Sequence, residues 1–341
     1  MHPLQNECQR LVAAGVPGAF FYRMNSDGTS DFYTAGFADL VTRQPMTSDL
    51  HYRVGSTTKT FTAVVLLQLV AEGKLQLQNS IQRWLPELPI PNASSLTIEH
   101  LLRMRSGLFD FEDDSTLLGK LDAHRRPYTL QQVLDMSIKH PAKFSPDDHF
   151  EYCNTNFCML ERVIERITSH TLADELAHRI LNPLGLSQTS YPAEADLTLP
   201  EPYIRGYERT AEGWEECSQV FFGRGDGALV STAPDIARFF QALLFQRILL
   251  PDDLLHQMMT VILDQPPAAM HYGMGLIADQ LSCGTLWGHS GGGFGYNHLP
   301  FLQCETGRFV LFMMNGSYGF RIAQGDRPVL DPAIRSKAYM Q

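Results

Sequence analysis

The 341-residue chain lacks the features that mark nucleic-acid-binding, membrane-spanning and zinc-binding proteins. Its 27 basic residues are outnumbered by 37 acidic ones, so no concentrated basic surface is available for a phosphate backbone. The longest apolar helical run, 64–71, is interrupted by Gln68 and falls far short of the roughly 20 residues that cross a bilayer. The twelve histidines include no His-Glu-x-x-His and no Cys/His spacing suited to zinc. We therefore expect no nucleic-acid partner, no membrane partner, no metal and no cofactor.

Cysteine is scarce and scattered, which argues against a disulfide framework. The six cysteines lie at positions 8, 153, 158, 217, 283 and 304. This spacing favours free thiols in a reducing compartment. Residues 1–10 contain no basic stretch followed by an apolar run, so they do not resemble a secretory signal. We expect a cytoplasmic protein, whose oligomeric state the sequence leaves open.

Patterns typical of strands lie near both ends of the chain, and patterns typical of helices lie between them. Strands are predicted at 18–24, 31–37, 284–289, 295–302 and 308–314, and helices at 57–72, 154–168, 172–181 and 235–245. The segment 182–185 is expected to break the third helix. We predict an α/β (α+β) fold in which both chain ends form one antiparallel sheet, flanked by helices, with an inserted, mainly helical lobe. The whole of 1–341 is expected to be one catalytic domain, with a sheet lobe at about 10–60 plus 225–341 and a helical lobe at about 61–224.

The segment 54–59, Val-Gly-Ser-Thr-Thr-Lys, places a hydroxyl and an amine one helical turn apart at the start of a predicted helix. A serine hydroxyl is a weak nucleophile until a neighbouring group accepts its proton. A lysine in a partly desolvated pocket can be neutral enough to help, and the helix N-terminus favours a developing oxyanion. Ser56 and Lys59 are therefore candidate catalytic residues. Taken alone, the pattern favours an N-cap serine with a surface lysine over a catalytic pair.

Two further clusters carry groups suited to the same chemistry. Tyr152 and Asn154 precede a predicted helix, so that a phenol and a carboxamide can point from one loop into a cleft. The segment 287–292, Trp-Gly-His-Ser-Gly-Gly, is predicted to lie on an edge strand, where glycines let a substrate backbone approach closely. Cys153 is interpreted as a buried spacer, and the tripeptide 224–226, Arg-Gly-Asp, as structural.

These three clusters, in this order, resemble the penicillin-recognising serine enzymes, in the branch of class C β-lactamases, the Streptomyces DD-carboxypeptidase and related esterases. The resemblance covers roughly residues 10–320. It includes 101–108, Leu-Leu-Arg-Met-Arg-Ser-Gly-Leu, where Met104 stands at a position often occupied by histidine. The segments 183–186 and 227–232 also match the family pattern.

The resemblance implies a β-lactamase/transpeptidase-like fold and assigns a role to each candidate residue. Ser56 would be the nucleophile, Lys59 its proton partner, and Tyr152 the general base that then protonates the leaving group. Substrate would be bound by Asn154, His289, Gly291 and Gly292, with His289 where many relatives have lysine. The backbone N–H groups of Ser56 and Gly292 would form the oxyanion hole, and no metal is implied.

The sequence leaves the acyl donor open. Carboxypeptidases of this branch need a cation for the substrate carboxylate, and 271–287 contains no Arg or Lys. We therefore expect an esterase, amidase or peptidase that acts on a small ester, amide or peptide. The alternatives are a β-lactamase or D-amino-acid-specific carboxypeptidase, a slowly deacylating sensor or binding protein, and a scaffold with an inert site.

Overall fold

The computed structural model describes residues 2–262, 271–318 and 330–340. Its helices are α1 Pro3–Ala13, α2 Thr58–Ala71, α3 Ile98–Leu102, α4 Leu121–His124, α5 Leu130–Ile138, α6 Thr155–Thr168, α7 Leu172–Leu176, α8 Asn182–Leu184, α9 Ala233–Phe240, α10 Asp252–Met259 and α11 Pro332–Met340. The 3₁₀ turns are η1 Gly55–Thr57, η2 Ile81–Arg83 and η3 Phe111–Asp113, and the π turns are η4 Ala177–Leu181 and η5 Gln241–Phe245.

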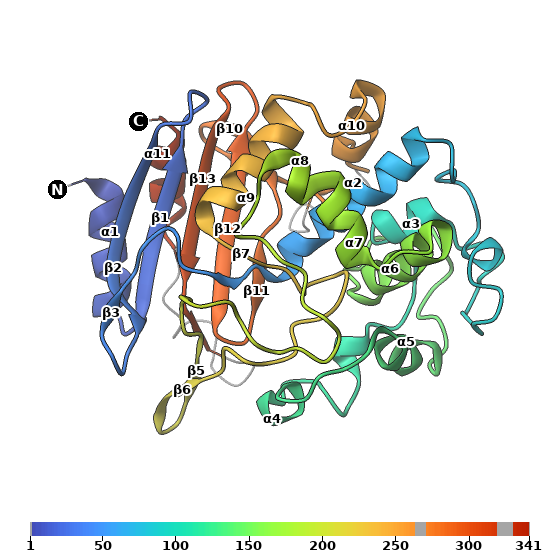
Figure 1. Cartoon of the computed structure of the whole chain (residues 1–341), viewed down its shortest axis with the longest axis horizontal. Helices are drawn as coiled ribbons and strands as arrows, with labels where there is room; N and C mark the ends of the chain where they lie inside the picture. The colour runs from blue at the N-terminus through green and yellow to red at the C-terminus, as the bar shows by residue number, and fades with distance from the viewer. Residues whose placement is uncertain (1, 263–270, 319–329, 341) are drawn as a thin grey trace.

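Both ends of the chain contribute to one antiparallel sheet, as the sequence predicted (Figure 1). Its order is β3-β2-β1-β13-β12-β10-β9-β8, with β11 paired to β12. The strands are β1 Gly18–Met24, β2 Ser30–Asp39, β3 Gln44–Pro45, β8 His271–Tyr272, β9 Ile277–Leu281, β10 Gly284–Gly288, β11 Gly291–Gly293, β12 Tyr296–Gln303 and β13 Arg308–Met314. The minor pairings join β4 Tyr52–Arg53 to β7 Val230–Ser231, and β5 Tyr207–Thr210 to β6 Gly213–Glu216 and to β14 Gly316–Ser317.

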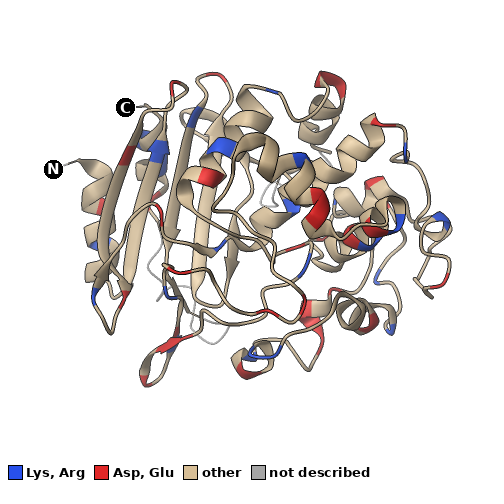
Figure 2. Cartoon of the chain, viewed as in Figure 1, with Lys and Arg blue, Asp and Glu red and all other residues tan. Residues whose placement is uncertain are grey.

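Helices cover the sheet, and a second group of helices packs around α2. In Figure 1, α1 and α11 lie beside each other against the strands of the two chain ends, and α9 crosses the sheet on the viewer's side. Helix α2 is buried on nearly all sides, since α6 and α7 pack against it. The central strands are nearly free of charge, whereas the surrounding helices and loops carry both signs interspersed (Figure 2). The centre of the sheet is therefore stabilised by apolar burial rather than by ion pairs.

Two sequence predictions need correction, and several helices were not predicted. The strand β10 is not an edge strand, because it lies between β9 and β12. Of the two strands in the segment 287–292, only β11, which continues the line of β10 along β12, has a single partner. The segment 182–185 does not break the third helix at once: π turn η4 and α8 continue it, and Gly185 ends it at φ +63°. Pro183 is tolerated because the first turn of α8 does not need its N–H. The helices that the sequence did not predict are α1, α3, α4, α5, α10 and α11.

The six cysteines are all free thiols, as expected. Within the described residues, no helix combines the length and the apolar character that a membrane span requires. Residues 2–262, 271–318 and 330–340 also contain no cluster of three or more His, Cys, Asp or Glu side chains able to hold a metal ion.

Candidate active site

Ser56 lies in the 3₁₀ turn η1, which leads directly into α2. Gly55 precedes it with φ +51°, a conformation that L side chains rarely adopt. A Cβ atom on Gly55 would lie only 3.0 Å from the backbone nitrogen of Gly292. Glycine at position 55 therefore lets the nucleophile turn pack directly against β11. This contact brings Gly292 beside Ser56, where the resemblance places the oxyanion hole.

The glycines of β11 are required by the same close packing. A Cβ on Gly291 would lie 2.0 Å from the carbonyl oxygen of Val54, and one on Gly293 would lie 2.4 Å from the ring of Phe222. Gly292 itself is exposed. A strand without side chains at these positions leaves its backbone open next to Ser56. That is the geometry that an oxyanion hole and a substrate-binding strand require.

Lys59 is completely buried, and its three ammonium protons have three acceptors. Nζ donates to Ser56 Oγ at 3.0 Å, to Asn154 Oδ1 at 2.7 Å and to the backbone oxygen of Asp226 at 2.9 Å. The Asp226 carboxylate lies 3.9 Å from the same nitrogen. The structure thus brings Ser56, Lys59 and Asn154 together, and the alternative of a surface lysine is excluded.

The charge state of Lys59 differs from the sequence expectation. Burial lowers the pKa of its ammonium, but negative charge on Tyr152 and on Asp226 raises it more, so that the pKa lies above its ordinary value of 10.5. Lys59 is therefore a cation at neutral pH. In this state it polarises Ser56 and donates hydrogen bonds, and it has no free lone pair with which to accept the serine proton.

Asn154 is held by Asp110, a residue that the sequence analysis missed. One oxygen of Asp110 accepts from the backbone N–H of Asn154 at 2.9 Å and from its Nδ2 at 3.0 Å. Because a carboxylate accepts the amide N–H, the amide oxygen is directed to Lys59. Burial raises the pKa of Asp110 to about 7, although the Asn154 N–H opposes this rise. Asp110 follows directly on the family segment 101–108, which was its only sequence signal.

The ring of Tyr152 lies beside the Lys59 ammonium. Nζ is 5.0 Å from the centre of the Tyr152 ring, and the ring is half-buried. Tyr272 meets it edge-on at 6.1 Å between ring centres, and His289 lies at 6.3 Å. The phenol is thus adjacent to the Ser56–Lys59 pair, as the motif spacing predicted.

His289 is buried and neutral, which sets it apart from the lysine that the resemblance places there. Its Nε2 lies 3.0 Å from the Tyr272 hydroxyl and its Nδ1 lies 2.7 Å from the Ser290 carbonyl oxygen. Burial, together with the charge of Lys59, lowers the pKa of His289 to about 3. The side chain therefore brings no positive charge to the cleft. Its direct contact with substrate stays a prediction.

A second buried histidine, His298 on β12, fixes the nucleophile turn and was not predicted. Its Nε2 lies 2.7 Å from the Val54 carbonyl oxygen and 2.8 Å from Thr57 Oγ1. Thr57 in turn donates to the His289 carbonyl oxygen at 2.6 Å. Burial lowers the pKa of His298 to about 4. These bonds join β12, the end of β10 and η1 around Ser56.

Two segments interpreted as structural have different outcomes. Cys153 is buried, its Sγ lies 3.6 Å from the Leu108 carbonyl oxygen, and burial raises its pKa well above the ordinary range, as suits an inert spacer. In the tripeptide 224–226, Arg224 and Gly225 do bind a buried carboxylate, that of Glu161. Asp226, however, lies against Lys59, a contact that the sequence analysis did not predict.

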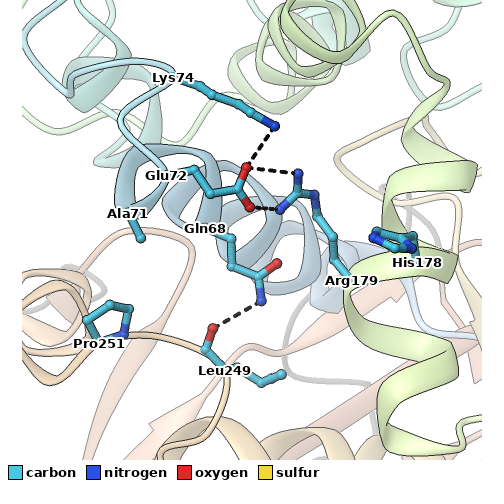
Figure 3. A pocket seen from close by; sticks show the side chains of 8 residues that line it. All are labelled: Gln68, Ala71, Glu72, Lys74, His178, Arg179, Leu249 and Pro251. Carbon is cyan, nitrogen blue, oxygen red and sulfur yellow. Dashed lines mark hydrogen bonds and ion pairs between the residues drawn. The ribbon is translucent and has the colours of Figure 1, made fainter.

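A separate hollow of about 520 Å³ lies at the other end of α2 (Figure 3). It is lined by Gln68, Ala71, Glu72, Lys74, His178, Arg179, Leu249 and Pro251. Its Glu72 carboxylate pairs with both Lys74 and Arg179. These charges satisfy one another, and the hollow contains none of the groups predicted to be catalytic. We therefore do not assign the chemistry to it.

The fold is that of the penicillin-recognising class of serine enzymes. The chain belongs to the Beta-lactamase family, whose sequence profile matches residues 4–333. The family resemblance and the fold predicted from it are both confirmed.

Among solved structures, the D-amino acid amidase of Ochrobactrum anthropi SV3, in complex with L-phenylalanine amide, is 29% identical, with a TM-score of 0.86 over 99% of this chain and 97% of that chain. A D-stereospecific amidohydrolase from Streptomyces sp. is 31% identical, with a TM-score of 0.84 over 93% and 94% of the two chains. Esterase EstB of Burkholderia gladioli is 26% identical over 89% of this chain and 86% of its own. The chain spans only 64% of penicillin-binding protein 4* of Bacillus subtilis and 38% of the D-aminopeptidase of Brucella anthropi.

Proposed function

We propose that this protein is a serine hydrolase that cleaves an amide or ester bond of a small substrate through an acyl-enzyme on Ser56. The observation that carries the proposal is the buried Lys59 ammonium, which joins Ser56 Oγ at 3.0 Å to Asn154 Oδ1 at 2.7 Å. Burying a lysine costs folding free energy, so a buried lysine that contacts a serine hydroxyl indicates a functional role. A cation beside a serine hydroxyl helps to activate it as a nucleophile.

In the proposed acylation, Ser56 Oγ attacks the substrate carbonyl while its proton passes to Tyr152. The form of Tyr152 that accepts this proton is the phenolate. Lys59 stays protonated and stabilises the phenolate before the transfer and the negative charge that develops on Oγ during it. The backbone N–H groups of Ser56 and Gly292 hold the oxyanion. Tyr152 then delivers its proton to the leaving amine or alcohol as the carbonyl–leaving-group bond breaks. In deacylation, water loses a proton to Tyr152, attacks the ester, and Ser56 Oγ recovers that proton.

For the substrate, we propose an amide or ester with a small neutral leaving group. Strands β8, β9 and β10 carry no Arg or Lys, which agrees with the lack of a cation for the free carboxylate of a carboxypeptidase substrate. Two structural neighbours are named for action on D-amino acid amides or for D-stereospecific amide hydrolysis. We therefore propose D-amino acid amides as the first class to test, with carboxylic esters second. The free thiols support a cytoplasmic location as part of the proposal.

The test is a panel of D- and L-phenylalanine amide, p-nitrophenyl acetate and nitrocefin, with product release and intact protein mass both followed. Ser56→Ala is the control for every substrate. Turnover of the D-amide above the L-amide supports the amidase. A stable mass adduct without turnover would indicate the slowly deacylating sensor, and rapid nitrocefin hydrolysis would indicate the β-lactamase. Activity that persists in Ser56→Ala would refute the nucleophile.

A further inference from the structure

The carboxylate of Asp226 lies in a sealed pocket behind the proposed nucleophile. Its side chain is 6% exposed, and Oδ2 lies 3.9 Å from Lys59 Nζ. The other oxygen, Oδ1, accepts from the Arg224 backbone N–H at 2.8 Å and from the Cys158 thiol at 3.2 Å. A Cβ on Gly223 would lie 2.6 Å from both carboxylate oxygens, so no space remains for a longer acid.

The groups around this carboxylate favour its charged form. Both hydrogen-bond partners of Oδ1 donate, and the nearest charged neighbour of Oδ2 is a cation. Burial holds the pKa of Asp226 above its ordinary value, and the Lys59 charge and the Arg224 N–H oppose that rise. A buried charge of this kind persists only where a partner compensates it. The partner here is Lys59, which already donates to the backbone oxygen of the same residue.

We propose that Asp226 is a positioning residue that acts through Lys59: its carboxylate is the buried counter-ion that keeps the lysine protonated and directed at Ser56. This inference rests on the proposed serine hydrolase. It extends that proposal by giving Lys59 and Tyr152 different roles in catalysis. With Asp226 in place, Lys59 supplies fixed positive charge and Tyr152 alone exchanges the proton.

Other titratable and charged groups also face the pair, from every element packed against it. They are Asp110 and Glu112 at η3, Tyr152 before α6, Cys158 and Glu161 on α6, His289 after β10, and Arg224 on the loop of Asp226. Glu161 is fully buried and compensated by Arg224, by the Tyr191 hydroxyl and by the Gly225 N–H. Asp110 is bonded to Asn154. Glu161 and Asp110 thus have other partners. Asp226 is the carboxylate whose charged partner is Lys59.

The test replaces Asp226 by asparagine, which keeps the shape, the backbone oxygen and an Oδ1 acceptor but removes the charge. The readout is the rate at which a fluorophosphonate labels Ser56 between pH 6 and 11, followed by intact mass, so that no knowledge of the substrate is needed. A nearby opposite charge shifts a pKa by about one to three units. We therefore expect the loss of labelling at alkaline pH to begin at least about one pH unit lower in Asp226→Asn than in the wild type. A merely structural role would lower the rate by the same factor at every pH.

Cys158→Ala is the matched control, because it removes the other side-chain partner of Asp226 Oδ1 and leaves both charges in place. Its alkaline limb should coincide with that of the wild type. Parallel profiles for Asp226→Asn and wild type would overturn the inference. If Asp226→Asn does not fold, as judged by circular dichroism, the wild-type profile still decides: an alkaline fall below pH 9 would show that Lys59 is not held protonated. A wild-type enzyme that is not labelled on Ser56 at any pH would instead refute the proposed function.

Discussion

Helix α2 carries a lysine–carboxylate pair near each of its ends, and the two pairs have opposite surroundings. Near the N-terminal end, Lys59 and Asp226 are 0% and 6% exposed and lie 3.9 Å apart. Just past the C-terminal end, Lys74 and Glu72 are 48% and 40% exposed and lie only 2.8 Å apart. Although Lys74 and Glu72 lie closer together, their ion pair contributes less to the stability of the fold. Water can solvate each of these exposed charges about as well as its ion-pair partner does. The buried pair has no such substitute, so removing one partner leaves a charge without compensation.

Among the changes near the buried N-terminal end of α2, Ser56→Ala should have the largest effect on activity. Loss of the nucleophile removes the acyl-enzyme, so we expect kcat/KM to fall at least about a thousandfold. The fall is measured on whichever amide or ester the wild type hydrolyses. Peptide mapping that places a fluorophosphonate label on another residue would contradict the assignment.

Lys59→Met should damage both activity and stability, because it leaves Asp226 charged and buried. We expect a loss of about 3–5 kcal/mol in the free energy of unfolding, measured with urea. The double variant Lys59→Met/Asp226→Asn should recover part of that stability and none of the activity. If the single variant were as stable as the wild type, the buried pair would not differ from the exposed pair in the way described.

Tyr152→Phe should separate proton transfer from packing, since it keeps the ring and removes the hydroxyl. General acid–base groups contribute about 10² to 10⁴ in rate. We expect a loss in that range for an amide and a smaller loss for a matched p-nitrophenyl ester, because only the amine leaving group strongly requires a proton. Equal losses in acylation rate would restrict Tyr152 to the role of base, and no loss would remove it from the mechanism.

His298→Gln should change how stability depends on pH. The pKa of His298 is lowered by burial to about 4 from an ordinary value of 6.5, so the unfolded chain binds the proton more readily than the folded protein. Its contribution is therefore complete above pH 6.5 and is lost as the pH falls toward 4. Between pH 7 and pH 5 that loss is about 2 kcal/mol for one such histidine. The variant should lose correspondingly less over this interval in thermal or urea unfolding. An unchanged pH slope would show that His298 is not neutral in the folded protein.

Glu72→Gln should have the smallest effect, because it acts at the solvated end of α2. The hydrogen bond from Arg179, with Lys74 in support, lowers the pKa of Glu72 to about 2. Its contribution is therefore present above pH 4.5 and fades as the pH falls toward 2. Solvent screens this exposed cluster, so we expect less than about 1 kcal/mol in unfolding at pH 7 and no change in kcat/KM. A loss of activity would show that the hollow in Figure 3 is coupled to Ser56.

The sequence predicted most of the sheet and the reactive groups, because both can be recognised from patterns within short segments of the sequence. Strand β13 was predicted at its observed bounds, and β1 likewise, since alternating or continuous apolar runs end at clear turns. The helix from Thr58 was predicted from its apolar spacing and from Gly73. Helices α1 and α11 escaped notice because each is short and polar on its outer face, and the sheet that each covers is formed by distant segments. The edge-strand error has another origin: β9, which forms a hairpin with β10, was not predicted as a strand.

The sequence by itself determined the chemical groups: a serine and a lysine one helical turn apart, a tyrosine and an asparagine before a second helix, and glycines on a strand near the end of the chain. Only the tertiary structure decided their states. Lys59 is a cation because chain folding places Tyr152 beside its ammonium and brings the carboxylate of Asp226, 167 residues away in sequence, to 3.9 Å from it. Asn154 directs its oxygen to Lys59 because Asp110, 44 residues earlier, accepts its N–H groups. Side-chain type is a local property, whereas protonation and orientation depend on the burial and the partners that long-range contacts supply.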